Sequence, residues 1–209
     1  MHVRDTKLTV DDITGVVGII PTPSIATADQ PGTAFSVDLD EAATLADAMV
    51  RGGGVDVLMT TGTFGECASL TWDELQSFVA TVVDAVAGRI PVFAGATTLN
   101  TRDTITRGGR RLGELGADGL FVGRPMWLPL DDAGIVRFYR DVAEAVPNMA
   151  LVVYDNPRRL QGKDRDARLR GTQPDTPPGR RCQASRAAQW LRLPFRPPRG
   201  KRSRAATAA

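Results

Sequence analysis

Glycines and hydroxyl side chains are concentrated in one stretch of the sequence, TTGTFGECASLTWDEL. Within it, Gly62 and Gly65 permit a tight turn whose backbone can come close to a ligand. The N–H groups of such a turn, together with the Thr63 hydroxyl, can bind an anion such as a carboxylate. The same stretch also fits an ordinary strand-to-helix connection, because Thr71 and Glu74 form a capping box at the start of a helix. These residues alone leave both interpretations open.

Tyr154 ends the apolar run MALVVY and is followed by Asn156 and Pro157, which interrupt regular structure. Catalytic groups of α/β proteins project from the carboxyl ends of strands, and a phenol in that position can relay protons. A tyrosine that packs at the rim, with its hydroxyl bonded to backbone, fits equally well. Nearer the glycine-rich turn, Glu66 is interpreted as a structural acceptor for loop amides, and nothing in the sequence indicates a lowered pKa for Cys67.

Five short apolar runs recur along the chain and are flanked by glycine or proline. They are rich in Val, Ile and Phe, and they are continuous rather than alternating, which is typical of strands buried on both faces. We therefore predict strands of a parallel sheet at 15–21, 55–59, 91–95, 119–123 and 149–154.

The segments between these runs have the apolar spacing of amphipathic helices. In the intervening segment 102–115 this spacing is weaker, because Gly108 and Gly109 lie in its middle and each costs about 1 kcal/mol relative to alanine. That segment is still predicted to be helical. The other predicted helices cover 39–50, 72–86 and 135–146.

Successive strand centres are about 30 to 40 residues apart, which is the length of one strand, one helix and the return. The chain up to residue 160 therefore holds five βα units, or four with a final strand. Such alternation predicts a parallel α/β sheet, which is either an open doubly wound sheet or part of a (β/α)8 barrel. Periodicity does not decide between the two.

The charge of the chain changes sign near residue 160. Residues 1–160 contain 13 Lys and Arg against 21 Asp and Glu, whereas residues 161–209 contain 13 against 3. The second stretch also holds eleven arginines and six of the fourteen prolines, and it has no sustained helix or strand period. It cannot bury a core of its own, so residues 161–209 are predicted to be a disordered or loosely attached basic tail. A native basic extension and a GC-rich gene read out of frame would both have this composition.

Composition disfavours several classes of function. The N-terminal sequence MHVRDTKLTVDD is too polar for a secretory or transit signal, and no apolar run approaches membrane-spanning length, so we expect a cytoplasmic protein without a membrane partner. Two cysteines, Cys67 and Cys182, cannot form a disulfide framework or a Cys-rich zinc site. His2 is the only histidine, which disfavours histidine-based metal or proton-shuttle chemistry. Hydroxyls, carboxylates, backbone amides or a lysine are left to do the chemistry.

Five motifs of the first 160 residues resemble those of a known family: IIPTP at 19–23, GTFGEC at 62–67, PVFAG at 91–95, GADG at 116–119 and YDNP at 154–157. In this order and spacing they resemble the superfamily of Schiff-base aldolases that contains dihydrodipicolinate synthase and N-acetylneuraminate lyase. GTFGEC in place of GTTGE, the PMWLPL stretch and NP after the tyrosine are most similar to the hydratase-aldolases that cleave hydroxybenzylidenepyruvate or carboxybenzalpyruvate. The resemblance covers roughly residues 13–160.

This resemblance implies a fold and an activity. The fold is α/β, a partial TIM (β/α)8 barrel of about five βα units over residues 1–160. The activity is hydration and retro-aldol cleavage of an aryl-substituted 2-oxobut-3-enoate to an aromatic aldehyde and pyruvate, with no cofactor and no metal. The family is usually homotetrameric. A 4-hydroxy-tetrahydrodipicolinate synthase-like activity is the alternative within the superfamily.

The same resemblance implies roles for single residues. Thr63 and the backbone amide of Phe64 would bind the carboxylate of a 2-keto acid such as pyruvate. Tyr154 would relay protons during imine formation and C–C bond change, and Asn156 would contact the substrate or the attacking water. Trp127, at the end of the fourth unit, would line the aromatic side of the pocket, although packing at the rim is an equal alternative for it.

The family's chemistry also needs a lysine at the end of the sixth strand, whose amine condenses with the keto group and serves as an electron sink. One further βα unit of about 30 residues places this position at 180–186, where the sequence reads RRCQASR. The only lysines are Lys7, Lys163 and Lys201, and arginine offers no free amine. The chain is therefore expected to show little or no turnover.

A barrel that stops after five strands has two open sheet edges, and their apolar surface predicts poor solubility or aggregation. Two further hypotheses stay open. One is a non-catalytic protein whose basic tail binds nucleic acid or another polyanion; it is less favoured, and steeply salt-dependent affinity that is lost on deletion of 161–209 would support it. The other is a complete five-stranded flavodoxin-like domain, which reversible two-state unfolding of residues 1–160 would support.

Overall fold

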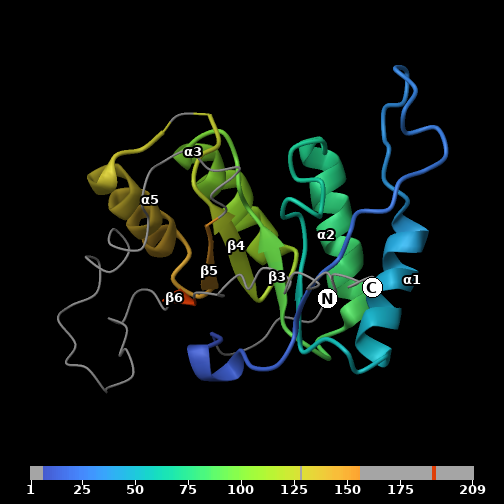
Figure 1. Ribbon diagram of the computed structural model, residues 1–209, viewed down its shortest axis with the longest axis horizontal. Coiled ribbons are helices and arrows are strands. Elements are labelled where there is room, and N and C mark those ends of the chain that lie inside the picture. Colours follow the sequence, from blue (N-terminus) through green and yellow to red (C-terminus); the bar gives the residue numbers. More distant parts are fainter. Residues whose placement is uncertain (1–6, 128, 156–189, 192–209) are drawn as a thin grey trace, which may run out of the picture.

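The computed structural model describes residues 7–127, 129–155 and 190–191. Its neighbouring strands follow one another along the chain and are all parallel (Figure 1). A doubly wound sheet reverses its strand order at a switch point, so this continuous order identifies part of a barrel. The five strands predicted from the apolar runs are confirmed. The strands are β1 (Val17–Ile19), β2 (Val57–Met59), β3 (Val92–Gly95), β4 (Gly119–Gly123), β5 (Ala150–Tyr154) and β6 (Trp190–Leu191).

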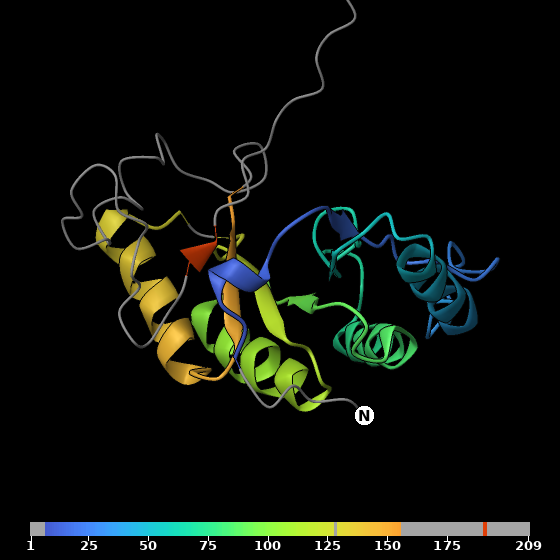
Figure 2. The ribbon, with the colours of Figure 1, turned by 90° about the horizontal axis from the view of Figure 1, so that it is seen from below.

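Helices connect the strands and cover one face of the sheet. Figure 2 shows the sheet as an arc, with these helices along its outer side and the short helix η1 (Val10–Asp12) on its inner side. Up to β5 the chain holds four βα units and a final strand. No helix in the described ranges is long and apolar enough to cross a membrane. The connecting helices are α1 (Leu39–Arg51), α2 (Trp72–Val86), α3 (Thr101–Asp103), η2 (Thr104–Arg111), α4 (Leu112–Glu114) and α5 (Asp132–Ala145).

The arc of strands separates two apolar clusters. Successive side chains of a strand point to opposite faces of the sheet. In β2, for example, Leu58 packs outward under the helices, whereas Val57 and Met59 point to the inner side. Strands β2, β3 and β4 are therefore buried on both faces, which explains why they are continuous apolar runs. The inner cluster consists of Leu8, Val57, Met59, Phe93, Phe121, Ala150 and Val152.

The start of α2 is fixed by the capping box that the sequence predicts. The Glu74 carboxylate accepts hydrogen bonds from the backbone N–H and the hydroxyl of Thr71, both at 2.8 Å, and from the backbone N–H and the hydroxyl of Ser36, both at 2.6 Å. Burial raises the pKa of Glu74, but these hydrogen bonds outweigh burial and lower the pKa to about 2. Glu74 thus ties the start of α2 to the connection between β1 and α1.

The segment 102–115 is helical, as predicted, but it is not α-helical throughout. Its central turns form η2, which is a π-helix between the short helices α3 and α4. A carbon added to Gly108 would lie 2.6 Å from Cβ of Ala96, and one added to Gly109 would lie 2.7 Å from a methyl carbon of Val146. The two glycines weaken the helix pattern in the sequence because they allow η2 to pack closely against its neighbours.

Of the predicted basic tail, the structure describes Trp190 and Leu191, which form β6. These residues pair in parallel with Leu151 and Val152 of β5. At these two positions the structure has a strand where disordered chain is expected from the sequence. The edge of β5 offers unpaired backbone N–H and C=O groups, and the backbone of residues 190–191 pairs with them. The rest of the predicted tail lies outside the described residues.

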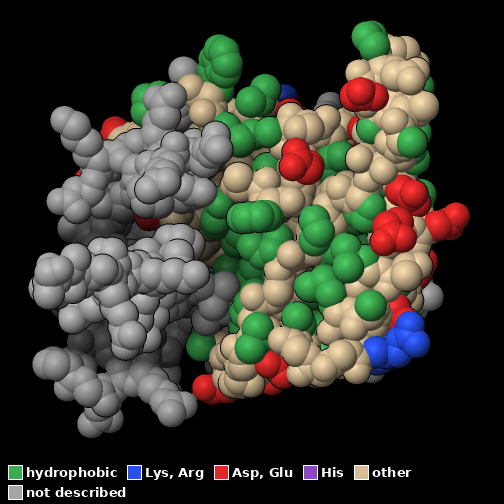
Figure 3. Space-filling model, turned by 45° about the vertical axis from the view of Figure 1, so that its right-hand side comes forward, with side chains coloured by type: hydrophobic (Ala, Val, Ile, Leu, Met, Phe, Trp, Pro, Cys, Tyr) green, Lys and Arg blue, Asp and Glu red, His purple; other side chains and the backbone are tan. Residues whose placement is uncertain are grey.

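At the opposite edge of the sheet, β1 pairs with β2 alone among the described residues. Val16, beside this strand, is 56% exposed, and Ile19 within it is 36% exposed. Figure 3 shows hydrophobic side chains gathered over the middle of the face that it presents. Exposed apolar surface beside a strand edge supports the expectation of aggregation, which stays a prediction.

Candidate active site

The two hydroxyl residues singled out in the sequence meet in the structure. The hydroxyl of Thr63, in the loop after β2, lies 2.8 Å from the phenol oxygen of Tyr154 at the end of β5. Strands β3 and β4 lie between them, and three steps across a flat sheet measure about 14 Å. The contact forms because the sheet curls and the loop reaches over the carboxyl ends of the intervening strands. The roles of both residues in the chemistry stay predictions.

Phe121 of β4 lies beneath this contact. Its ring centroid is 4.6 Å from that of Tyr154, with 47° between the ring planes. A carbon added to Gly62 would lie 2.7 Å from Cε1 of Phe121, so the backbone of the loop rests on the ring. Phe121 is buried and sets the spacing between the loop and Tyr154. This role has no signal in the sequence, where Phe121 looks like an ordinary core residue of the run GLFVG.

Three large apolar side chains are exposed in the loops that follow β2, β3 and β4. Phe64 is 78% exposed, Leu99 is 59% exposed and Trp127 is 73% exposed. The carboxyl ends of parallel barrel strands lie at one end of the fold, so these three side chains lie at the same end as Tyr154. That is where the sequence analysis expects Phe64 and Trp127. Leu99 was not predicted, although a leucine in the polar loop TTLNT is a usable signal.

Asn156, which is predicted to contact the substrate, lies outside the described residues. Its neighbour Asp155 accepts a hydrogen bond at 3.0 Å from the guanidinium of Arg124, which follows β4. The side chains of Arg124 and Asp155 are only 6% and 21% exposed. An unpaired charge at such a place is costly, so each holds the other in position. This ion pair connects the end of β5 to the residue after β4, beside Tyr154, and it was not predicted from the sequence.

Tyr139 of α5 is the second tyrosine of the chain, and its environment is structural. It is buried, and its hydroxyl donates to the backbone oxygen of Val122 at 3.4 Å. Burial raises the pKa of Tyr139 strongly, and the nearby charges of Arg124 and Asp155 act on it in opposite directions. Its phenol therefore stays protonated, and Tyr139 connects α5 to β4 through this hydrogen bond.

Glu66 and Cys67, at the end of the loop, are in structural environments. The Glu66 carboxylate accepts a hydrogen bond at 3.2 Å from the hydroxyl of Ser69 rather than from a loop amide. Burial and the negative charge of Glu66 raise the pKa of the Cys67 thiol, so it is not activated as a nucleophile. In the described part of the chain, no group of three or more His, Cys, Asp or Glu side chains could hold a metal ion.

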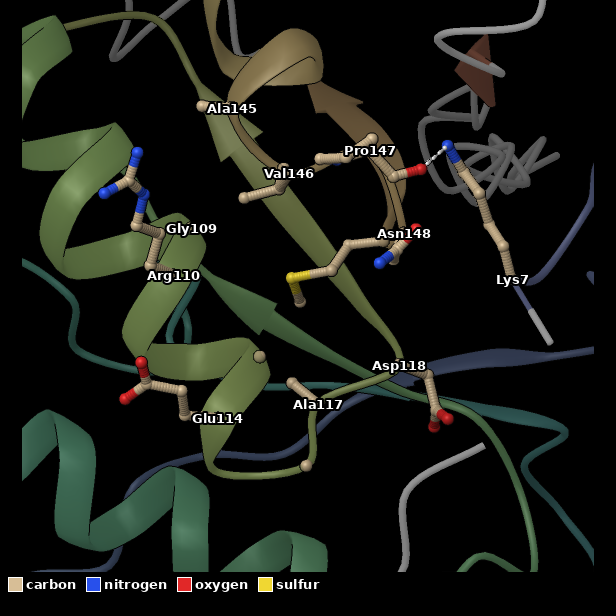
Figure 4. Close-up of a pocket in the computed structure, with 13 residues that line it drawn as sticks. Lys7, Gly109, Arg110, Glu114, Ala117, Asp118, Ala145, Val146, Pro147 and Asn148 are labelled. Atoms are coloured by element: carbon tan, nitrogen blue, oxygen red, sulfur yellow. Dashed lines mark hydrogen bonds between the residues drawn. The ribbon is translucent and has the colours of Figure 1, made fainter. Parts of the chain in front are cut away.

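Lys7 is the one lysine within the described residues, and it lies at the opposite end of the strands from Tyr154. Its amine donates a hydrogen bond at 2.8 Å to the backbone oxygen of Pro147, just before β5. It lines a cavity of about 600 Å³ (Figure 4), and burial lowers its pKa. The rise along β5 alone, at about 3.3 Å per residue, separates the two ends by about 13 Å. Lys7 therefore cannot form an imine with a ligand at Tyr154.

The fold and these contacts define a class of protein. The structure is part of a parallel barrel, and it carries a glycine-rich loop, a threonine and a tyrosine in hydrogen-bond contact, and exposed apolar side chains at the carboxyl ends of its strands. The carboxyl ends of the strands are where (β/α)8 enzymes carry their active sites.

The chain belongs to the dihydrodipicolinate synthetase family, which matches residues 17–163. Trans-2'-carboxybenzalpyruvate hydratase-aldolase from Nocardioides sp. (strain KP7) is 57% identical over 156 residues, which make up 75% of this chain and 46% of that protein. Trans-O-hydroxybenzylidenepyruvate hydratase-aldolase from Pseudomonas putida is 46% identical over 159 residues, which make up 76% of this chain and 47% of that protein. The chain thus spans about half the length of the curated relatives it matches.

Solved structures have the same fold over the matched part. The structure of PhdJ bound to a substrate intermediate is 95% identical with a TM-score of 0.73, over 76% of this chain and 49% of that one. Dihydrodipicolinate synthase from Aquifex aeolicus is 26% identical with a TM-score of 0.62, over 70% of this chain and 46% of that one. The family resemblance and the partial barrel inferred from the sequence are therefore confirmed, and the flavodoxin-like alternative is wrong.

Proposed function

We propose that this chain carries the substrate-binding part of a hydratase-aldolase, a lyase that cleaves an aryl-substituted 2-oxobut-3-enoate to an aromatic aldehyde and pyruvate. The observation that carries this proposal is the 2.8 Å contact between the hydroxyls of Thr63 and Tyr154. This contact puts a group that can bind a carboxylate beside a group that can move a proton. The hydratase-aldolases among the relatives support the same reaction class.

Each end of the substrate has residues to receive it. The Thr63 hydroxyl and the backbone N–H of Phe64 bind the carboxylate of the 2-keto acid, at the edge of the glycine-rich loop. Tyr154 exchanges a proton with the group that reacts next to it. The exposed rings of Phe64 and Trp127 line the aryl side, and Asn156 contacts the substrate or the water that adds to its double bond.

Phe64 favours an aromatic substrate over the synthase-like alternative. By resemblance it replaces the second threonine of the synthase branch, and it is 78% exposed. An apolar ring at this position removes a hydroxyl that a polar substrate would use and adds surface on which an aryl group can stack. We expect a benzylidenepyruvate to bind more tightly than pyruvate, and equal affinities would favour the synthase-like alternative.

The covalent step of the family needs an amine beside Tyr154, and the region where the resemblance expects it, RRCQASR, contains no lysine. We therefore propose that the chain binds a 2-keto acid without forming an imine and turns it over little or not at all. A homotetrameric assembly and a cytoplasmic location are also proposals, and light scattering coupled to gel filtration tests the first of them.

Two measurements on the full chain test this function. With pyruvate and borohydride, intact-mass spectrometry should find no covalent adduct, and a stoichiometric adduct on any lysine would overturn the proposed absence of an imine.

In calorimetry the parent should bind pyruvate, and Thr63→Val should bind it about tenfold more weakly, because a hydrogen bond to a charged group is lost. Thr44→Val, which removes an exposed hydroxyl on α1, is the matched control. A parent that binds no 2-keto acid would contradict the proposal.

A further inference from the structure

The loop after β2 begins at Thr61, a buried residue with an unusual backbone conformation. Its φ is 44°, in the left-handed region that β-branched residues rarely adopt. Its side chain is completely buried. A conformation of this kind carries a cost that the surrounding contacts must offset, and such residues concentrate at functional sites.

The hydroxyl of Thr61 continues the bonding between β2 and β3 where the backbone ladder stops. The backbone N–H of Thr60 still donates to the backbone oxygen of Phe93 at 2.9 Å. One residue further on, the N–H of Gly95 donates to the Thr61 hydroxyl at 3.0 Å, and that hydroxyl lies 3.1 Å from the backbone oxygen of Gly95. The side chain thus satisfies both polar groups of Gly95 while the main chain turns away from the sheet.

Two glycines enclose the backbone of Thr61. A carbon added to Gly95 would lie 2.1 Å from the carbonyl oxygen of Thr61, and one added to Gly65 would lie 2.5 Å from its nitrogen. Gly65 is itself held from the side of β1, because its carbonyl accepts a hydrogen bond at 2.9 Å from the hydroxyl of Thr22. The start of the loop is therefore packed closely between Gly95 and Gly65.

We propose that Thr61 is a positioning residue of the site: its hydroxyl fastens the start of the loop to Gly95 and so holds the Thr63 hydroxyl within hydrogen-bond distance of Tyr154. Gly62 alone separates the two threonines, and it rests on the ring of Phe121. No flexible segment lies between the fastened residue and the one that contacts Tyr154. If Thr61 relaxed to an ordinary φ, Thr63 would move away from the phenol.

The two tyrosines of the chain provide a direct readout of this contact. The full chain labelled with carbon-13 at the tyrosine Cζ gives one NMR signal for each, and Tyr154→Phe assigns them. Thr61→Val keeps the shape of the side chain but removes the hydroxyl; it should shift the Tyr154 signal and raise the pyruvate dissociation constant about tenfold, since small misplacements of binding groups are costly. Thr61→Ser keeps the hydroxyl and should restore both values.

A matched control removes another buried threonine hydroxyl. Thr104 is equally buried, and its hydroxyl donates to the backbone oxygen of Asn100 at 3.0 Å, in the loop after β3. Thr104→Val should lower stability to a similar degree and leave the Tyr154 signal in place. A folded Thr61→Val variant with an unchanged Tyr154 signal would overturn the proposal, as would a Thr61→Ser variant that behaves like Thr61→Val.

A second variant covers the case in which Thr61→Val does not fold. Glycine adopts positive φ without strain, so Thr61→Gly removes the hydroxyl and the conformational cost together. It should also shift the Tyr154 signal, and an unshifted signal would overturn the proposal.

The pyruvate readout rests on the proposed function, whereas the NMR readout does not. A parent that binds no pyruvate, together with a shifted Tyr154 signal in Thr61→Val, would contradict the proposed function and support the positioning role.

Discussion

Glu74 is a buried carboxylate whose hydrogen bonds stabilise its charged form. Because its pKa is lowered to about 2 in the folded protein, it contributes stability above the unfolded value of about 4.3, and this contribution is lost as the pH falls through the folded value. We predict that the free energy of unfolding falls by about 2 kcal/mol between about pH 5 and pH 2, measured by urea denaturation at each pH. Glu74→Gln should lower stability at pH 7 and flatten this profile. Glu41→Gln, at an exposed position of α1, should leave the profile unchanged. A Glu74→Gln profile as steep as the parent's would contradict this assignment.

Phe121 supports Tyr154 from below, so its truncation should affect both stability and the site. Phe121→Ala removes a buried ring and should cost about 3–5 kcal/mol in denaturant unfolding, while Phe121→Leu should cost less. The Tyr154 ring signals in NMR should shift in both variants, because the ring contact at 4.6 Å is lost. Phe93→Leu, in the same inner cluster on β3, is the control. If it moved the Tyr154 signals as much as Phe121→Leu does, Phe121 would have no special role.

The residues of the site differ in how far they could be predicted from the sequence. Thr63 and Tyr154 were identified because a hydroxyl in a glycine-rich turn and a phenol at a strand end are chemically distinctive. Thr61 and Phe121 were missed because their roles depend on a positive φ and on the curl of the sheet, and neither has a local sequence signal. Residues with distinctive chemistry can therefore be predicted from sequence patterns more readily than residues that hold them in position.

At the scale of elements, the glycines of η2 make an unusual prediction. In an exposed helix, Gly→Ala stabilises by about 1 kcal/mol. Here Gly108→Ala and Gly109→Ala should each destabilise by roughly 1–3 kcal/mol, because the added methyl would meet Ala96 or Val146 at under 3 Å. Thermal and urea unfolding measure the change. Gly54→Ala, whose methyl would meet nothing within 4 Å, is the control and should stay within about 0.5 kcal/mol of the parent. Stabilisation by Gly108→Ala would show that η2 does not pack this tightly.

Strands and most helices were predictable because burial on two faces and burial on one face leave different apolar periods. The π-helical turns of η2 were not, since they arise from close packing between elements distant in sequence. Strand order was open for the same reason: an open doubly wound sheet and a barrel have the same alternation of strands and helices. Only the family motifs favoured the barrel before the structure showed the continuous order.

At the scale of the whole molecule, the curl of the sheet brings loops that are distant in sequence together at one end of the fold. The loops after β2, β3 and β4 and the end of β5 carry Thr63, Leu99, Trp127 and Tyr154, and the contact between the first and last of these crosses the mouth of the arc. The curl follows from the twist of parallel strands and from helices packed on the outer side. Within the described part of the chain β1 pairs with β2 alone, so one edge of the arc is open.

The exposed edge of β1 should govern how the chain behaves in solution. Val16 is 56% exposed beside this edge, so lysine there costs little burial and puts a charge where another strand would have to pair. We predict that Val16→Lys reduces aggregation several-fold, measured by light scattering during concentration, with the free energy of unfolding changed by less than about 0.5 kcal/mol. Val10→Lys adds the same charge at a similarly exposed valine, 42% exposed, that lies in the short helix η1 rather than beside β1. Equal protection by both variants would attribute solubility to net charge rather than to the strand edge.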